Sequence, residues 1–282
     1  MKKIIYILLC CAGVISFSSC ELFQLDNYAA PKETIKGAVL DVATGDTVYT
    51  DDGTTKDNNN PSEGTRIRLR ELSWTETAVP DNYDFYCMNN GTFQDTKVFK
   101  GYYNVQLDGA FIPLIRIDQQ GDTIADESKY IQIQGVTVAD FKVQPFLKVA
   151  WVGTPTVSNG KVTATFIVTR AVSPADFQAK VAPMGGWNDN FLDITDVTLF
   201  VSESPSVGYR DSRPGTSPYS VQVNYNESDF NSLLGQPVTV TSTGTIPAGR
   251  TVFVRAGARM RYQTIGMQHN NYNVAIRVDT TK

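Results

Sequence analysis

The side chains that most often carry catalysis are sparse in this 282-residue sequence. His269 is the only histidine, so one chain cannot build a multi-histidine zinc site, and a histidine general base would have to be this residue. No G-x-S-x-G nucleophile elbow and no Gly-x4-Gly-Lys-Ser/Thr phosphate loop occurs. Any two of the 29 acidic residues can meet in space as a glycosidase pair, but the sequence singles out none. We therefore expect a protein that binds without catalysis and without a cofactor.

Aromatic residues in polar loops are a stronger signal, because sugar rings stack on flat side chains while amides and carboxylates bond their hydroxyl groups. One such loop holds a tryptophan beside two glycines, and two tyrosines bracket a loop rich in Pro and Gly. The candidate ligand-binding residues are Trp187, Asn188, Asp189, Tyr209, Tyr219, Asn271 and Tyr272. The alternative for Trp187 is a loop anchor that packs onto its own domain. Trp74 and Trp151 accompany apolar strand patterns, so we expect them in the core or between domains.

The charged residues argue against nucleic acid as a partner, because the net charge is −4 and phosphate binding needs concentrated positive charge. One basic stripe stands out. Arg255, Arg259 and Arg261 share one face of a predicted strand, opposite an apolar face. Arg277 joins them if the last strand pairs with this one. This face either grips an anionic sugar or a transporter complex, or lies in solvent paired with acids such as Asp196.

Acidic and amide side chains cluster in a polar segment of the first half of the chain. Asp51, Asp52, Asp57 and Asn58 carry oxygen atoms that calcium prefers, but their spacing fits no EF-hand loop. We therefore expect residues 41–64 to form a long solvated surface loop, with calcium binding at residues 51–58 as the alternative.

The amino terminus resembles a lipoprotein signal peptide. Lys2 and Lys3 precede an apolar stretch over residues 4–17, which is shorter than the about 20 residues needed to span a bilayer. Small residues then lead to Cys20, as in a lipobox, so we expect removal of residues 1–19 and acylation of Cys20 with palmitate. The alternative is an ordinary signal peptide that is cleaved near Ser19.

The remainder of the chain predicts an all-β fold of two tandem β-sandwich domains. Residues 20–31 form a lipidated tether, residues 32–144 a first sandwich and residues 145–282 a second, because strand patterns restart after Gln144-Pro145. Asn159-Gly160 is typical of a type I′ hairpin. Only two short helical pieces are expected, one after the N-cap Ser173 and one after Ser228.

Four stretches of the sequence carry a resemblance to a known family. They are CELFQLDNYAAPKETIKGAVL, GTRIRLREL, NNGTFQDTKVFKGYYNV and FKVQPFLKVAW. These resemble a family of uncharacterised lipoproteins associated with Sus-like glycan uptake systems. The resemblance implies a first domain similar to the transthyretin-like, carboxypeptidase-regulatory sandwich and a second similar to an immunoglobulin or fibronectin type III module. It carries no catalytic or binding motif with it.

The resemblance also implies partners and a location. Members of that family are encoded beside a TonB-dependent outer-membrane transporter and its lipoprotein lid, which implies lipid anchoring in the outer membrane with the protein facing the exterior. Our hypothesis is non-catalytic capture of glycan for the transporter. The alternatives are a structural accessory subunit that binds no sugar and an adhesin-like surface protein. An exposed aromatic platform favours glycan binding, whereas a buried Trp187 with an apolar flat patch elsewhere favours the structural subunit.

Overall fold

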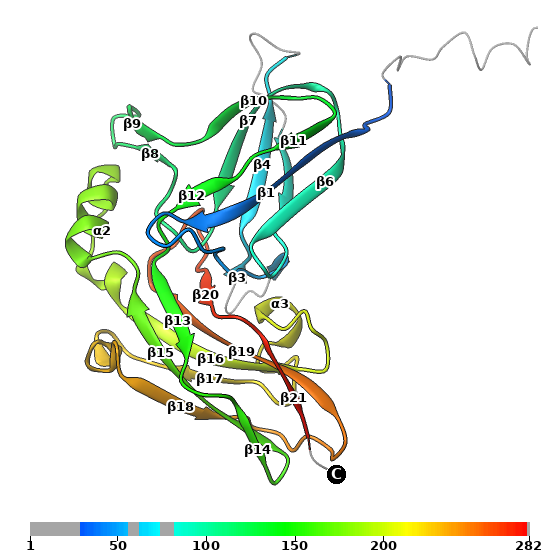
Figure 1. Ribbon diagram of the computed structural model, residues 1–282. Helices are drawn as coiled ribbons and strands as arrows, with labels where there is room; N and C mark the ends of the chain where they lie inside the picture. The colour runs from blue at the N-terminus through cyan, green and yellow to red at the C-terminus, as the bar shows by residue number, and fades with distance from the viewer. Residues whose placement is uncertain (1–28, 56–61, 74–81, 281–282) are drawn as a thin grey trace, which may run out of the picture.

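The computed structural model describes residues 29–55, 62–73 and 82–280, and its fold is all-β as expected (Figure 1). Strands β1 to β12 form a first unit and strands β13 to β21 a second, each with its own hydrophobic cluster. The proposed domain boundary lies between these units, and independent folding of each stays a prediction. The signal peptide, Cys20 and Trp74 lie outside the described residues. Within the described ranges, no helix is long and apolar enough to cross a bilayer.

The first unit packs two four-stranded sheets against each other. In one sheet, β1 pairs with β6, β11 and β12. In the other, the order is β10-β7-β4-β5. The bounds are β1 Glu33–Asp41, β6 Thr92–Val98, β11 Val136–Val138, β12 Phe141–Val143, β10 Lys129–Ile133, β7 Gly101–Asp108, β4 Arg66–Glu71 and β5 Asn82–Tyr86. Alternate residues of both sheets fill the space between them, because successive side chains of a strand point to opposite faces.

Two small hairpins extend from this unit. They are formed by β2 (Thr54–Thr55) with β3 (Ser62–Glu63), and by β8 (Ile115–Ile117) with β9 (Thr123–Asp126). The β8–β9 hairpin lies beside the helical segment of the second unit (Figure 1).

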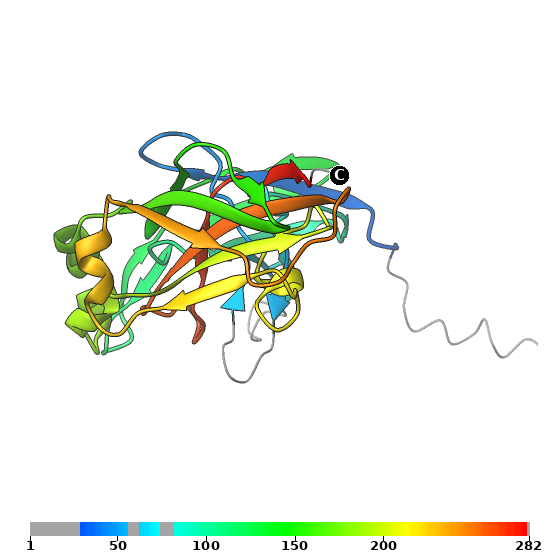
Figure 2. The same cartoon turned by 90° about the horizontal axis from the view of Figure 1, so that it is seen from below.

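The second unit is also a sandwich, as the view from below shows (Figure 2). One sheet has the order β13-β15-β14 with β18 on β15, and the other has the order β17-β16-β19-β20 with β21 on β19. The bounds are β13 Leu147–Trp151, β14 Thr156–Ser158, β15 Lys161–Arg170, β18 Pro237–Thr241, β16 Ile194–Ser202, β17 Val221–Asn224, β19 Thr251–Met260, β20 Asn270–Tyr272 and β21 Ile276–Asp279.

The predicted hairpin turn and the predicted helix N-cap of this unit are confirmed. Asn159 and Gly160 have φ values of 51° and 70°, as a type I′ turn requires, and they connect β14 to β15. Ser173 caps α2 (Pro174–Val181) by accepting the backbone N–H of Asp176 at 3.1 Å. The expectation of only two helical pieces is wrong. Besides α2 and η3 (Asp229–Leu233), short helices form at η1 (Ala182–Met184), η2 (Asp189–Leu192) and α3 (Tyr209–Ser212).

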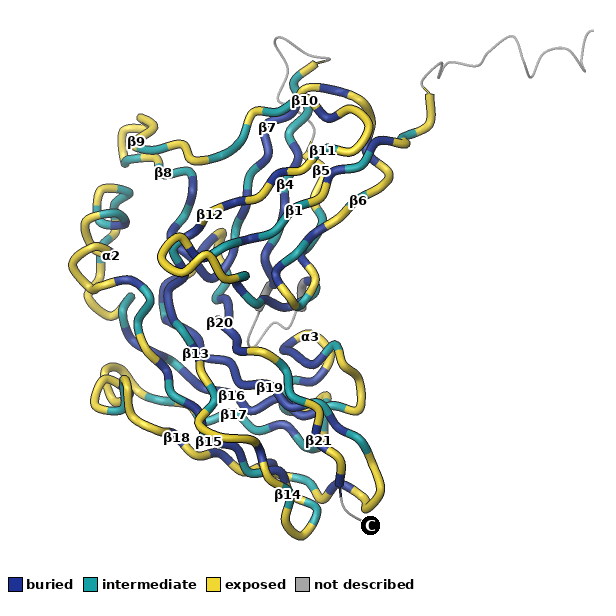
Figure 3. The backbone as a smooth tube through the Cα atoms, viewed as in Figure 1, coloured by how far each residue is buried: buried dark blue, intermediate teal, exposed yellow. Residues whose placement is uncertain are grey.

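The junction between the units is buried, and β20 lies within it (Figure 3). The expectation that residues 41–64 form a solvated loop is wrong for its middle part. Val48 is buried in the hydrophobic cluster of the first unit, and Thr50 and Asp51 are buried because they contact the second unit at α3, β19 and β20. Ala110 and Ile112 also belong to the first unit in sequence, and they pack in the hydrophobic cluster of the second. Residues of the first unit therefore contribute to the core of the second, while the two hydrophobic clusters remain distinct.

Candidate functional site

The tryptophan loop lies between α2 and β16. Gly185 and Gly186 have φ values of 92° and 65°, which reverse the chain after η1. The indole N–H of Trp187 donates to a carboxylate oxygen of Asp189 at 2.9 Å, and Asn188 caps η2 by accepting the N–H of Asn190. The half-buried indole packs against the hydrophobic cluster of its own unit. Trp187 is thus a loop anchor, and contact with a sugar there stays a prediction.

The expectation that Tyr209 and Tyr272 are exposed stacking platforms is wrong. Their side chains are 2% and 7% exposed, because α3 and β20 lie in the junction between the two units. The Tyr272 hydroxyl is 3.1 Å from a carboxylate oxygen of Asp51 and accepts the backbone N–H of Tyr209. The Tyr272 ring covers the guanidinium of Arg255 at 4.2 Å from the ring centre. Both tyrosines hold the junction together.

Asn271 and Tyr219 also lack the geometry of a shared binding site. Asn271 is 3% exposed; its side chain accepts the N–H of Leu147 and donates to the carbonyl of Ala110. The expectation that it binds ligand hydroxyls is therefore wrong, because both its polar atoms bond buried backbone groups. Tyr219 is half-buried against the cluster of the second unit. The structure does not bring these two residues to Trp187.

The arginine stripe is buried at Arg255 and Arg259, whereas the side chains of Arg261 and Arg277 are 41% and 63% exposed. Arg255 and Arg259 are 1% and 2% exposed, because this face of β19 meets residues 49–52 and α3. The expected partner is right: Arg259 donates from two nitrogens to one carboxylate oxygen of Asp196, each at 2.8 Å. Burial opposes the charge of Arg259, but the Asp196 carboxylate outweighs it, so the Arg259 pKa is raised. Arg277 joins the same face at the exposed end of the sheet.

Arg255 bonds backbone carbonyls on both sides of the junction. Its guanidinium donates to Thr50 and Asn89 of the first unit at 2.9 and 3.0 Å, and to Val207 and Asn273 of the second at 3.3 and 2.9 Å. Desolvation lowers the Arg255 pKa, and the nearby Tyr272 and Asp51 oppose that shift. This arginine is a structural connector and is not available to a ligand.

His269, Trp151 and Cys87 have structural roles too, and for Trp151 packing in the core is the sequence prediction. His269 is 3% exposed, and its imidazole lies 3.3 Å from the carbonyl of Thr264. Trp151 packs on the second cluster and donates its indole N–H to the carbonyl of Val274. Cys87 is 1% exposed in the first unit, and burial raises the pKa of its thiol.

The suggested calcium ligands do not form a metal site in the described part of the chain. Asp51 accepts backbone N–H groups of Asp52 and Arg210, and burial raises its pKa. Asp57 and Asn58 lie outside the described residues. Among the residues that the structure describes, no group of three or more His, Cys, Asp or Glu is placed to hold a metal ion.

An exposed pair of tyrosines lies on the outer face of the β10-β7-β4-β5 sheet. Tyr102 on β7 and Tyr130 on β10 are 42% and 54% exposed. Tyr130 pairs with Asn104, and Tyr102 is its diagonal neighbour across the two strands. We call this surface the tyrosine face; its outward residues are Arg66, Arg68, Arg70, Tyr102, Asn104, Gln106, Tyr130 and Gln132. It combines flat rings with amide and guanidinium groups on an open sheet.

Hydrogen bonds hold the polar groups of the tyrosine face in place. Asn104 is 2% exposed and donates to the hydroxyl of Ser128 at 2.6 Å, while the side chain of Gln106 donates to the side-chain oxygen Oδ1 of Asn104. The Tyr130 hydroxyl donates to Asp126 at 3.1 Å. Burial and that carboxylate raise the pKa of Tyr130, and the charge of Arg70 opposes the shift. The Tyr130 ring is thereby oriented beside the fixed amides.

A signal for the tyrosine face is present in the sequence. Tyr103, Val105 and Leu107 point into the core, so alternation places Tyr102 outward with Asn104. The aromatic candidates of the sequence analysis lie in loops and leave this pair out, although an outward strand face presents flat rings equally well.

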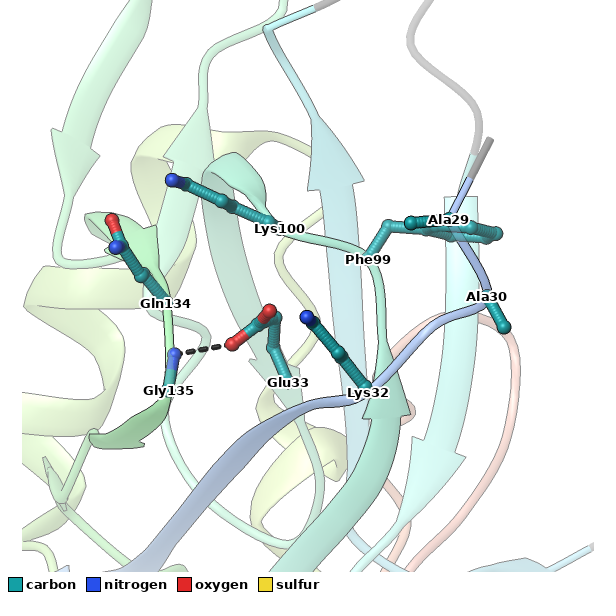
Figure 4. Close-up of a pocket in the computed structure, with 8 residues that line it drawn as sticks. All are labelled: Ala29, Ala30, Lys32, Glu33, Phe99, Lys100, Gln134 and Gly135. Atoms are coloured by element: carbon teal, nitrogen blue, oxygen red, sulfur yellow. Dashed lines mark hydrogen bonds between the residues drawn. The ribbon is translucent and has the colours of Figure 1, made fainter. Parts of the chain in front are cut away.

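A hollow of about 670 Å³ lies where the described chain begins (Figure 4). The carboxylate of Glu33 points into it and accepts the N–H of Gly135, while Lys32 and Lys100 are exposed around it. The hollow is lined by Ala29, Ala30, Lys32, Glu33, Phe99, Lys100, Gln134 and Gly135. With one aromatic ring and solvated lysines, it is a weaker glycan site than the tyrosine face.

Comparison with solved structures places this architecture among related proteins. A DUF3823 family protein from Bacteroides uniformis matches with a TM-score of 0.80 and 47% sequence identity, over 89% of this chain and 100% of the other. A proposed carbohydrate-binding protein from Bacteroides uniformis matches with a TM-score of 0.57 and 19% identity, over 88% and 99% of the two chains. A DUF3823 family protein from Parabacteroides merdae matches with a TM-score of 0.55 and 15% sequence identity, over 89% of this chain and 100% of the other. No family model and no curated protein matches the sequence.

Proposed function

The chain belongs to the DUF3823 family, and from that premise we propose that it binds glycan without catalysis at the surface of the outer membrane. The observation that carries the proposal is the exposed pair Tyr102 and Tyr130 on an open sheet. Aromatic rings exposed side by side lose contact with water only when a flat apolar surface covers them, and the faces of sugar rings are such surfaces. The side-chain amides of Gln106 and Gln132 beside them suit sugar hydroxyls.

Two further considerations support a glycan ligand. A structural neighbour has a proposed carbohydrate-binding role and shares the fold. The tyrosine face is also shallow and open, so it suits a polymer that engages repeatedly, where modest affinity at each site is amplified. In this proposal the protein supplies capture alone, and the chemistry belongs to other proteins.

The location and partners complete the proposal. We place the protein in the outer membrane through acylated Cys20, beside a TonB-dependent transporter and its lipoprotein lid. The support is the lipobox-like sequence and the resemblance to lipoproteins of Sus-like uptake systems. Captured glycan would pass to the transporter, and the protein itself would stay at the surface.

Cys20→Ala is expected to move the protein from the membrane to the soluble fraction. Each buried methylene of an acyl chain contributes about 0.8 kcal/mol to membrane binding, and the acidic domains offer nothing comparable. The measurement is fractionation of cells grown with labelled palmitate. Cys11→Ala, within the predicted signal peptide, is the matched control and keeps both label and anchoring. Membrane retention with palmitate incorporation in Cys20→Ala would contradict the assignment.

Tyr102→Ala and Tyr130→Ala are each expected to weaken glycan binding. By analogy with stacking on other rings, the loss of one platform costs about 1 to 3 kcal/mol, or about 5- to 150-fold in affinity. The measurement is affinity electrophoresis in starch, xylan, mannan, polygalacturonate and chondroitin sulfate, followed by calorimetry with those that bind. Tyr83→Ala is the control, since Tyr83 is 49% exposed but lies outside the tyrosine face.

The outcomes of this experiment separate the candidate sites. If Trp187→Ala loses affinity while the tyrosine variants retain it, the glycan lies at the tryptophan loop and the tyrosine face is the wrong site. If the wild type binds no polymer, the structural accessory subunit becomes the better interpretation. That alternative has its own support, because Val136 and Val138 on the short edge strand β11 are 64% and 62% exposed.

A further inference from the structure

The arginines of the tyrosine face differ in whether an acid neutralises them. Arg66 pairs with Asp108 at 2.8 Å, and Arg68 forms a two-pronged pair with Asp84 at 2.7 Å for each bond. Asp108 and Asp84 lie directly opposite these arginines on the neighbouring strands. Cross-strand positions thus supply an acid to each of the first two arginines on β4.

Arg70 continues the row, but its cross-strand neighbours are neutral. It lies opposite Asn82 on β5 and Asn104 on β7, where the earlier pairs have aspartates. Within the described part of the chain, no carboxylate forms an ion pair with Arg70. Among the described residues, Arg70 is therefore the arginine of this row without an ion-pair partner, and it lies at the tyrosine end of the row. The carboxylate of Asp126 also reaches this end, where it accepts the hydroxyls of Tyr130 and Ser128.

The position of Arg70 relative to the two rings suits one ligand. Arg70, Asn104 and Tyr130 lie in register across three adjacent strands, which are about 4.7 to 4.9 Å apart. Tyr102 is the diagonal neighbour of Arg70, within reach of its long side chain. A sugar stacked on the rings would hold a substituent over the guanidinium. The fork of nitrogens on arginine matches a planar carboxylate or a sulfate.

We propose that the tyrosine face selects anionic glycans, whose carboxylate or sulfate groups pair with Arg70. This inference rests on the proposed function, because it specifies the ligand class of the same face. With a neutral glycan bound, the guanidinium of Arg70 would form hydrogen bonds only with water or neutral groups and no ion pair. An anionic glycan gains a charge-assisted hydrogen bond in addition to stacking.

The experiment compares charged polymers with matched neutral ones. Calorimetry measures the binding of polygalacturonate against fully methyl-esterified pectin, and of chondroitin sulfate against desulfated and carboxyl-reduced chondroitin. We expect the wild type to bind at least one acidic polymer roughly 10- to 150-fold more tightly than its neutral counterpart, as for hydrogen bonds to charged groups. The two pairs of polymers distinguish a carboxylate from a sulfate.

Variants then locate the preference. Arg70→Gln is expected to lose it by binding the acidic polymer as weakly as the neutral one, while its affinity for the neutral polymer and its melting temperature stay unchanged. Arg277→Gln removes the same charge from an exposed site in the second unit and is expected to keep the preference. Raised salt should weaken the wild type more than Arg70→Gln.

The failures of the two proposals are distinguishable. Equal binding of acidic and neutral polymers, with loss of both in Tyr102→Ala, overturns the anionic preference and leaves the proposed function intact. An acidic preference that survives in a folded Arg70→Gln variant also overturns the inference, because another group would supply the charge. Absence of binding to every polymer overturns the proposed function, and this inference with it.

Discussion

Arg255→Met is expected to lower the free energy of unfolding by about 3 to 5 kcal/mol, the range for breaking buried charged contacts. The substitution introduces an apolar side chain of similar length and removes the arginine donor from four backbone carbonyls at the junction, of which that of Asn89 keeps the N–H of Thr50. It also removes the positive charge that stabilises buried Asp51. Chemical denaturation, followed by tryptophan fluorescence and circular dichroism, measures the loss.

The pH dependence gives an independent test of the same connector. Burial raises the folded-state pKa of Asp51 above its ordinary value, so ionising it costs stability as the pH rises from the ordinary to the raised pKa. Without Arg255 this cost increases, so the destabilisation should be larger at neutral pH than at acid pH. Arg277→Met is the control, since Arg277 is exposed, and it should cost less than about 0.5 kcal/mol. A similar small loss in Arg255→Met would contradict the structural role.

Asp196→Ala is expected to cost about 3 to 5 kcal/mol, because it leaves the guanidinium of Arg259 buried without its carboxylate. Both side chains are 2% exposed, so water cannot replace the lost contact without opening the sheet. Thermal and denaturant unfolding measure the effect. Asp279→Ala removes an exposed carboxylate from the same sheet and is expected to change stability little.

A second variant tests whether the charge left behind causes the loss. The double variant Asp196→Leu with Arg259→Met replaces the pair by apolar side chains, so it should be more stable than Asp196→Ala. If the double variant is less stable than the single one, the unpaired charge of Arg259 is not the cause of the loss, and Arg259 contributes through its other contacts, such as the ring of Tyr209.

The strands were predictable because their signal is local. Alternation over β15 and β19 depends only on which face is apolar, and those faces do fill the core of the second unit. The sequence could not predict what covers the opposite face of β19. The segment that buries Arg255 there comes from about 205 residues earlier in the chain, at Thr50. Periodicity assigns a side chain to a face, whereas its burial depends on which distant segment packs there.

The predicted exposure of the loop tyrosines is wrong for the same reason, because burial depends on which distant segment packs there. Tyr209 and Tyr272 occupy polar segments, which normally lie at the surface, but these segments form the junction between two units. A polar composition is equally suited to a buried junction that is held by hydrogen bonds, as Asp51 and Asn271 illustrate. Tyr102 is absent from the sequence candidates although its alternation is visible, because those candidates come from polar loops.

The single thiol of the described residues gives the first unit a built-in reporter of its own opening. A thiol reagent needs access and a thiolate, and in the folded sandwich the side chain of Cys87 offers neither. Modification therefore proceeds only through states in which the first sandwich has opened, whatever the second unit is doing. Labelling rates under native conditions would accordingly separate the stability of one unit from that of the other, which a single global melting curve averages together.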